Sequence, residues 1–299
     1  MILRILPSRD LLYRHVEKQN HCLHSDKILV VLCENTKERL DHPEGFSFWV
    51  TTNSLGERIT PNIKSEQEIW VIGDSISMGY GIDDQKSFPY LLSLESGWKV
   101  RNLAVDSLGS AGIYQILSEK LKSSKKPNII FWIFSPSDFV DDPRWLKLKT
   151  NLVYRAIFVT QFIAGKYLYS VNFGKYILEK LKFSYKVNDY KNSSHNLPET
   201  NHITFEYINK TIWLAKQSQI PIYILLYPDR NLTLANAKTN KTLTDRVADW
   251  IQTNGGNSID LEKAFQDSNT NYYLPEGHPN EKAALLFTQF ALEIIKRHK

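Results

Sequence analysis

Two short segments carry residue types suited to nucleophilic catalysis. Residues 73–75 read Gly-Asp-Ser directly after an apolar run, and a serine at a strand-to-helix turn lies where the positive end of a helix dipole points. Residues 275–280 read Pro-Glu-Gly-His-Pro-Asn, which supplies an imidazole base and a nearby carboxylate. Either segment alone is more often a helix cap or a surface turn. Together they predict Ser75 as a nucleophile, His278 as its base and Glu276 as the acid that orients the base.

The elements that position these residues follow from the hydrophobic pattern. Four apolar runs indicate buried strands, at 69–72, 100–105, 129–134 and 220–227. A short fifth strand is expected to end at Asp260. Helix-like segments lie between and after these runs, at 88–96, 111–123, 204–218 and 281–296. This alternation predicts a parallel sheet covered by helices on both faces, with ligands bound at the carboxyl ends of its strands.

Residues 73–75 and 275–280 resemble the first and last motif blocks of the SGNH/GDSL hydrolase superfamily. The resemblance runs over residues 51–297, and the sequence is similar to bacterial members of that superfamily. The resemblance implies a flavodoxin-like three-layer α/β/α sandwich. It implies a serine esterase that needs neither a cofactor nor a metal. It also implies that Ser75, His278 and Glu276 form the catalytic triad.

The two middle motif blocks depart from the family's pattern. Counted from Asn102, Ser107 stands where the family has a glycine, and Ser137 stands where it has an asparagine. The resemblance therefore implies an oxyanion hole made by the Ser75 N–H, the Ser107 N–H and the Ser137 hydroxyl. Asp74, Asp106 and Asp138 fall within the blocks and are expected to line the cleft. Because nucleophile and base are intact, we expect an active or weakly active hydrolase.

The remaining chain divides into an extension and an insertion. Residues 1–67 suggest a β-rich extension with strands at 28–32 and 46–52, and residues 68–299 the main domain. A helical insertion is expected at about 140–200. The net charge of the chain is +5, but residues 143–192 hold ten basic and two acidic residues, net +8, with eleven aromatic ones. Such a segment is either a core-packed layer with snorkelling lysines or a cationic lid for acidic glycans or an anionic membrane; nucleic acid is not expected.

Few signals bear on compartment and metals. Cys22 and Cys33 are the only cysteines and match no metal-binding pattern, which favours bystander thiols in a reducing compartment. The chain has no recognisable signal peptide and no run of apolar residues long enough for a membrane span, so a cytoplasmic protein is expected, with peripheral membrane contact open. The acidic pairs at 83–84 and 141–142 are interpreted as solvated loop acids, not metal ligands.

These observations favour an esterase of O-acyl or acetyl groups on a carbohydrate or another small ester. Two alternatives stay open. One is a non-catalytic glycan- or lipid-binding protein of the same fold. The other is an O-acyltransferase that uses the same serine and histidine.

Overall fold

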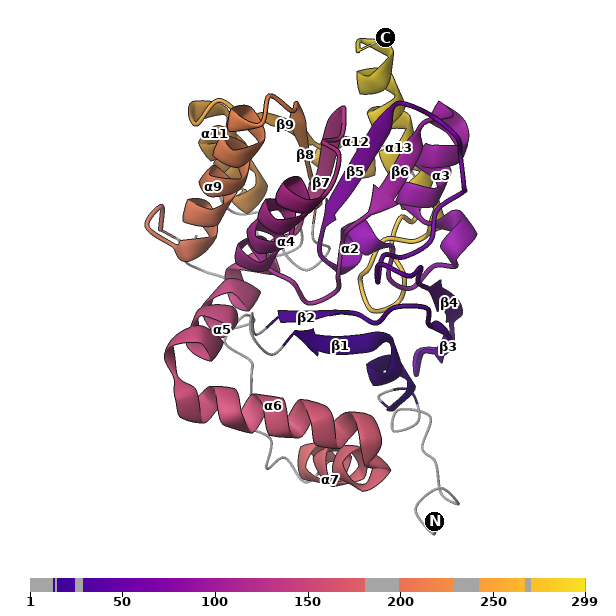
Figure 1. Ribbon diagram of the computed structural model, residues 1–299, viewed down its shortest axis with the longest axis vertical. Helices are drawn as coiled ribbons and strands as arrows, with labels where there is room; N and C mark the ends of the chain where they lie inside the picture. Colours follow the sequence, from indigo (N-terminus) through magenta and orange to yellow (C-terminus); the bar gives the residue numbers. More distant parts are fainter. Residues whose placement is uncertain are drawn as a thin grey trace.

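A five-stranded parallel sheet forms the centre of the fold (Figure 1). The structure is a computed structural model, and it describes residues 13, 15–24, 29–180, 199–228, 242–266 and 270–298. Its spatial order is β6-β5-β7-β8-β9, and every neighbouring pair is parallel. The strands are β5 (Glu68–Gly73), β6 (Lys99–Asn102), β7 (Ile129–Phe134), β8 (Ile222–Leu226) and β9 (Asn257–Asp260). This is the flavodoxin-like order, so the predicted fold class is confirmed. The ligand crevice of such a sheet lies at the carboxyl ends of β5 and β7.

Helices cover both faces of this sheet (Figure 1). Successive side chains of β7 alternate between two buried clusters, one on each face, as the period of a strand requires. One cluster includes residues of α3 (Phe88–Ser96) and α13 (Glu281–Lys296). The other includes residues of α4 (Ser110–Ser123), α9 (Ile203–Gln217) and α11 (Leu243–Thr253). Shorter elements are α2 (Ser75–Met78), η3 (Asp84–Lys86) and α12 (Glu262–Gln266).

Two antiparallel hairpins precede the sheet and lie near the carboxyl ends of its strands (Figure 1). After η2 (Lys18–Asn20), they pair β1 (His21–His24) with β2 (Leu29–Leu32), and β3 (Lys37–Asp41) with β4 (Ser47–Thr51). β2 and β4 coincide with the two strands predicted for this region. β1 and β3 were not predicted, because their residues are mostly polar and lack the apolar alternation of a half-buried strand.

The first hairpin is closed by a disulfide between Cys22 and Cys33. The interpretation of these cysteines as bystander thiols is wrong. Antiparallel pairing of β1 with β2 brings their Cα atoms to 5.0 Å, a separation that a disulfide spans. Disulfides persist mainly in oxidising compartments, so this bond counts against the reducing compartment inferred from the cysteine number.

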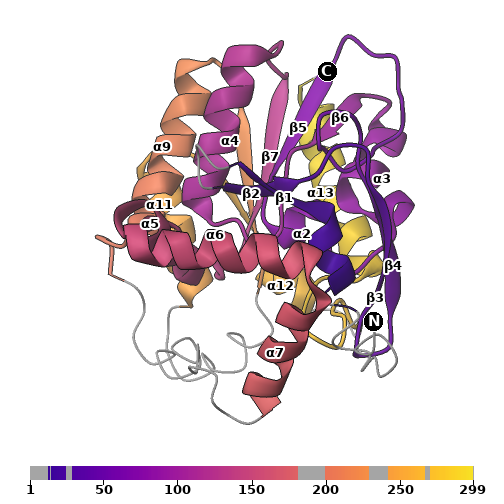
Figure 2. The ribbon, with the colours of Figure 1, turned by 60° about the horizontal axis from the view of Figure 1, so that its bottom comes forward.

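The insertion after β7 is helical, and Figure 2 shows it crossing below the sheet and the first hairpin. Its described helices are α5 (Asp138–Thr150), α6 (Leu152–Tyr167) and α7 (Tyr169–Lys180). The remainder of the predicted insertion, 181–198, lies outside the described residues. Within the described part of the chain, no helix combines the length and the apolarity needed to cross a bilayer.

Candidate active site

Ser75 lies at the turn between β5 and α2. Asp74 caps α2 by accepting a hydrogen bond from the Ile76 N–H at 2.9 Å. Gly73 has a φ of +139°, and a Cβ at this residue would lie 2.0 Å from the Ser77 Oγ. Only glycine therefore fits at this turn. Ser75 is the first residue of the helix, where N–H groups have no intrahelical acceptor.

His278 reaches Ser75 from the other end of the domain. Its Nε2 lies 2.9 Å from the Ser75 Oγ, across 203 residues of sequence. On the opposite side of the ring, its Nδ1 lies 3.3 Å from the Glu276 Oε1. That contact lacks hydrogen-bond geometry, because neither Glu276 oxygen has a hydrogen-bond partner among the described residues. The carboxylate is thus beside the ring without yet being bonded to it.

The turn that carries His278 is held on several sides. The Tyr227 hydroxyl donates to the Gly277 carbonyl at 2.7 Å, and the Leu274 N–H donates to the His278 carbonyl at 2.7 Å. The Tyr80 ring packs against the His278 imidazole with their centroids 4.8 Å apart. These contacts fix the ring's position relative to the start of α2.

Loop 79–84, which follows α2, is fixed by a buried arginine. The fully buried Arg58 donates to the carbonyls of Gly79 and Ile82 at 2.5 and 2.6 Å, and it pairs with Asp84 at 2.8 Å. Asp84 is therefore a buried ion-pair partner, and the interpretation of the pair at 83–84 as solvated acids is wrong for it.

Ser107 adopts a backbone conformation that favours glycine. Its φ is +59°, in the left-handed region, and its side chain is exposed. A glycine would adopt this conformation at lower cost than serine. Asn102 is buried, and its side-chain amide donates to the Met78 carbonyl at 3.2 Å, which ties the second motif block to α2.

The Ser137 hydroxyl is engaged with neighbouring side chains. It donates to the Asp74 Oδ2 at 3.1 Å and lies 2.9 Å from the Ser135 Oγ. A hydroxyl carries one proton, so Ser137 cannot donate to Asp74 and to a developing oxyanion at the same time. Burial raises the pKa of Asp74 to about 6, against the lowering effect of the Ile76 N–H.

One cavity of about 320 Å³, hereafter the Ser75 cavity, brings most of the predicted site together. The predicted residues that line it are Asp74, Ser75, Asp106, Ser107, Ser137, Glu276 and His278. Asp138 is the exception, so its predicted position in the cleft is wrong. It is buried at the start of α5, and its Oδ2 accepts a hydrogen bond from the Ser110 hydroxyl at 2.5 Å instead.

Asp142 and Asp141 also depart from the prediction of solvated loop acids. Asp142 is fully buried in α5, where it accepts from the Ala111 N–H at 2.8 Å and the Thr204 hydroxyl at 2.6 Å. Burial raises the pKa of Asp142 to about 6 and that of Asp141 to about 7. In the described part of the chain, no group of three or more His, Cys, Asp or Glu residues is arranged to hold a metal ion.

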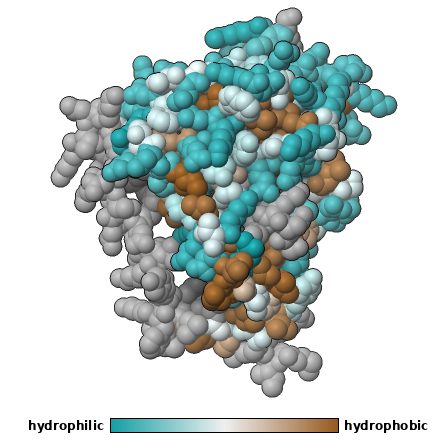
Figure 3. Space-filling view, turned by 60° about the vertical axis from the view of Figure 1, so that its left-hand side comes forward, coloured by the Kyte–Doolittle hydropathy of each residue, from teal (hydrophilic) through white to brown (hydrophobic). Residues whose placement is uncertain are grey.

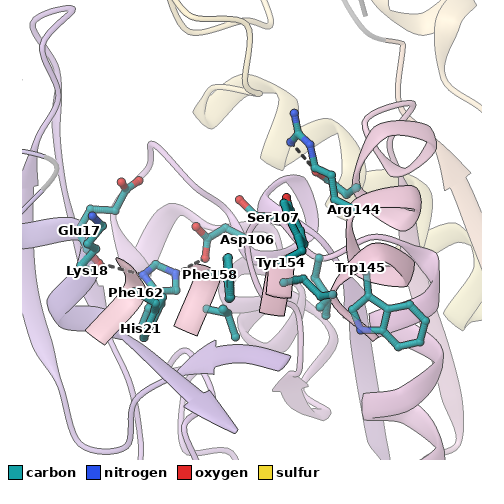
Figure 4. A pocket seen from close by; sticks show the side chains of 14 residues that line it. Glu17, Lys18, His21, Asp106, Ser107, Arg144, Trp145, Tyr154, Phe158 and Phe162 are labelled. Atoms are coloured by element: carbon teal, nitrogen blue, oxygen red, sulfur yellow. Dashed lines mark hydrogen bonds and ion pairs between the residues drawn. The ribbon is translucent and has the colours of Figure 1, made fainter. Parts of the chain in front are cut away.

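Sequence reasoning missed two residues of the N-terminal segment that reach the site. Glu17 lines the Ser75 cavity and accepts from the Tyr80 hydroxyl at 3.1 Å. His21 forms an ion pair with Asp106 (Figure 4). Burial lowers the pKa of His21, but the Asp106 charge and hydrogen bond outweigh it and raise the pKa to about 9. No local signal reveals this pair, because 85 residues separate its members.

A second cavity of about 340 Å³, hereafter the aromatic cavity, adjoins the first. The two share Glu17, Asp106, Ser107 and Asp141 as lining residues. Figure 4 shows the aromatic side chains that line it, which are Trp145 of α5 and Tyr154, Phe158 and Phe162 of α6. The α6 residues recur every four positions, which places them on one face of the helix.

Comparisons with known proteins give structural likeness alone. No family model and no curated protein matches the chain. Among solved structures, a carbohydrate esterase family 2 enzyme from Corynascus thermopiles is 14% identical, with 86% of this chain and 74% of that chain covered and a TM-score of 0.49. A member of the lipolytic G-D-S-L family from Veillonella parvula is 15% identical, with 77% and 99% covered and a TM-score of 0.48. A putative G-D-S-L lipolytic protein from Desulfitobacterium hafniense is 12% identical, with 76% and 98% covered and a TM-score of 0.46. These values are too low to carry a functional argument, which rests on the geometry of the site.

Proposed function

We propose that the protein is a serine-dependent ester hydrolase. The observation that carries this proposal is the 2.9 Å contact between the Ser75 Oγ and the His278 Nε2, with Glu276 beside the other ring nitrogen. Ser75 attacks the ester carbonyl while His278 accepts its proton. His278 then delivers that proton to the leaving alcohol. Water repeats the cycle on the acyl-enzyme.

The oxyanion of the tetrahedral intermediate needs donors already in place. The Ser75 N–H at the first position of α2 is one, and the Ser107 N–H on the cavity wall is the second. The Ser137 hydroxyl becomes the third only when it turns away from Asp74. Losing one such donor costs about 10²–10³ in rate, so we expect turnover below that of a site with three free donors.

The two adjoining cavities suggest how an ester is held. The Ser75 cavity is lined mainly by polar groups and suits the hydroxyl-rich alcohol of a carbohydrate ester. The aromatic side of the second cavity suits an apolar acyl group larger than acetyl, and the charged residues on its other side are paired, His21 with Asp106 and Arg144 with Asp141. The same two cavities could hold an acyl donor and an acceptor alcohol, which supports O-acyl transfer as the second candidate function.

The test is hydrolysis of p-nitrophenyl acetate and p-nitrophenyl octanoate by the wild type, Ser75→Ala and His278→Ala, together with labelling by a fluorophosphonate. We expect turnover and labelling by the wild type alone. Equal turnover by Ser75→Ala would overturn the proposal and leave a binding protein. An acyl-enzyme that forms but releases its acyl group only when a sugar alcohol is added would identify the transferase.

A further inference from the structure

Helix α6 presents an apolar surface to solvent. Leu152 is 72% exposed and Tyr167 is 74% exposed, although both belong to a helix rich in apolar residues. The solvent-facing residues recur at helical spacing, and none is charged. They are Leu152, Val153, Ala156, Ile157, Thr160, Gln161, Ile163 and Tyr167, with the C-cap residue Leu168, hereafter the outer face of α6.

This outer face is not needed for packing within the described molecule. The opposite side of α6 carries Tyr154, Phe158 and Phe162, which line the aromatic cavity. Gly165 is the only residue of α6 that is buried. Figure 3 shows apolar side chains gathered on the lower part of the molecule, where Figure 1 places α6 and α7. Exposed apolar surfaces of this kind mark places where another apolar phase or partner binds.

The charges around the outer face are basic. Residues 143–168 contain five Lys or Arg and no acidic residue. At the end of α5, Lys147 and Lys149 are exposed, and their ammonium groups lie over the rings of Tyr154 and Trp145, 4.5 and 4.1 Å from the ring centroids. The two basic residues of α6 lie beside the outer face and not on it: Arg155 donates to the Leu148 carbonyl, and Lys166 donates to the His21 carbonyl. An uncharged apolar face with basic flanks is the pattern of a helix that lies in the interface of an anionic bilayer.

We propose that α6 docks on the surface of an anionic phospholipid membrane, with its outer face at the boundary between headgroups and acyl chains. In the docked protein, Lys147 and Lys149 turn from these two rings toward the negative lipid headgroups. A second copy of the chain that met this face symmetrically would bring like basic charges together, and an acidic glycan would leave the apolar face uncovered. A membrane uses both features.

Docking would place the aromatic cavity directly behind the membrane-facing helix. This consequence, unlike the docking itself, rests on the proposed function. An ester with an apolar chain would then pass from the bilayer along α6 toward Ser107, which lies on the wall between the two cavities.

The experiment is co-sedimentation of the full chain with vesicles of phosphatidylcholine alone or mixed with phosphatidylglycerol. The Ser75→Ala protein is used throughout, so that binding is read without catalysis. We expect binding to the mixed vesicles that weakens in high salt. Ile157→Glu should reduce the partition coefficient about tenfold or more, and Lys147→Gln with Lys149→Gln should reduce it severalfold on anionic vesicles only.

The matched control is Leu94→Glu on α3, where the leucine is 59% exposed and Ile157 is 51% exposed. This control should bind as the starting protein does. Because both sites are on the surface, circular dichroism and urea midpoints are expected to stay unchanged. Equal loss in both variants, or no vesicle binding at all, would overturn the proposal.

Two further outcomes would replace it with another partner. Concentration-dependent dimerisation abolished by Ile157→Glu, without vesicle binding, would identify a second copy of the chain. Binding to a soluble acidic polysaccharide, without vesicle binding, would identify a glycan. Hydrolysis of soluble esters remains a separate measurement, so failure of docking and failure of the hydrolase proposal are distinguishable.

Discussion

Strand β7 and helix α6 are both strongly apolar, and they end in opposite environments. Every side chain of β7 is at most 2% exposed, because helices cover both faces of its sheet. In α6, by contrast, only Gly165 is buried, because the rest of the described chain meets one side of the helix. An apolar sequence therefore indicates that a surface will be buried, but it does not identify the element or partner that buries it. Residues at the carboxyl ends of the sheet's strands line the Ser75 cavity, and helices α5 and α6 of the insertion line the aromatic cavity.

The largest expected effect is a loss of turnover from substitutions in the Ser75 cavity. His278→Ala should reduce kcat/KM for a soluble ester by about 10⁶-fold, and Glu276→Gln by about 10⁴-fold at most. The smaller effect follows from the missing hydrogen bond between Glu276 and the ring. Steady-state kinetics with p-nitrophenyl acetate measure both. Comparable losses in the two variants would show that the carboxylate closes onto the ring during turnover.

The sheet, the position of Ser75 at a strand end and the helical insertion were predictable from sequence, but the contacts between distant segments were not. The continuous apolar runs of β5 and β7 predict strands buried on both faces. The glycine at 73 and the capping aspartate at 74 form the turn that holds Ser75 at the end of β5. The His21–Asp106 pair and the buried Asp142 arise from contacts between distant segments, for which local periodicity carries no signal. The Cys22–Cys33 bond likewise depends on β1, whose polar residues did not indicate a strand.

A stability comparison tests the contrast between sheet and insertion directly. Ile224→Ala in β8 removes a side chain with 0% exposure and should lower the free energy of unfolding by about 2–5 kcal/mol. Ile157→Ala, on the outer face of α6, should change it by less than about 0.5 kcal/mol. Urea unfolding measures both. A large loss for Ile157→Ala would mean that the outer face is covered within the chain itself.

Substitutions in the aromatic cavity should change kcat/KM according to the length of the substrate's acyl chain. Phe158→Ala enlarges the aromatic cavity and should lower kcat/KM for p-nitrophenyl octanoate by about tenfold, the scale of losing part of a hydrophobic pocket. Hydrolysis of p-nitrophenyl acetate should stay unchanged, since acetyl does not reach α6. Equal losses on both esters would place Phe158 in the structural support of Ser75.

The buried acids of α5 predict an unusual pH dependence of stability. Burial raises the pKa of Asp138 well above its usual value, and raises those of Asp142 and Asp141 to about 6 and about 7. The folded protein therefore holds more protons than the unfolded chain between about pH 4 and pH 7. The contribution of these groups is complete below pH 4 and is lost as the pH rises through 6 to 7. Asp138→Asn should flatten this fall in the urea midpoint; an unchanged slope would contradict it.

The smallest expected effect concerns Ser107, which lies on the wall between the Ser75 cavity and the aromatic cavity. Ser107 holds a left-handed backbone conformation that costs a residue with a Cβ about 1–2 kcal/mol, whereas glycine pays about 0.5–1 kcal/mol in chain entropy. Ser107→Gly should therefore raise the free energy of unfolding by roughly 0.5–1 kcal/mol. The N–H proposed to face the oxyanion is retained, so kcat should change by less than about twofold. Destabilisation would show that the wall, and not the local turn, selects this conformation. A large fall in kcat without destabilisation would assign the Ser107 hydroxyl a part in the reaction that its position on both cavities permits.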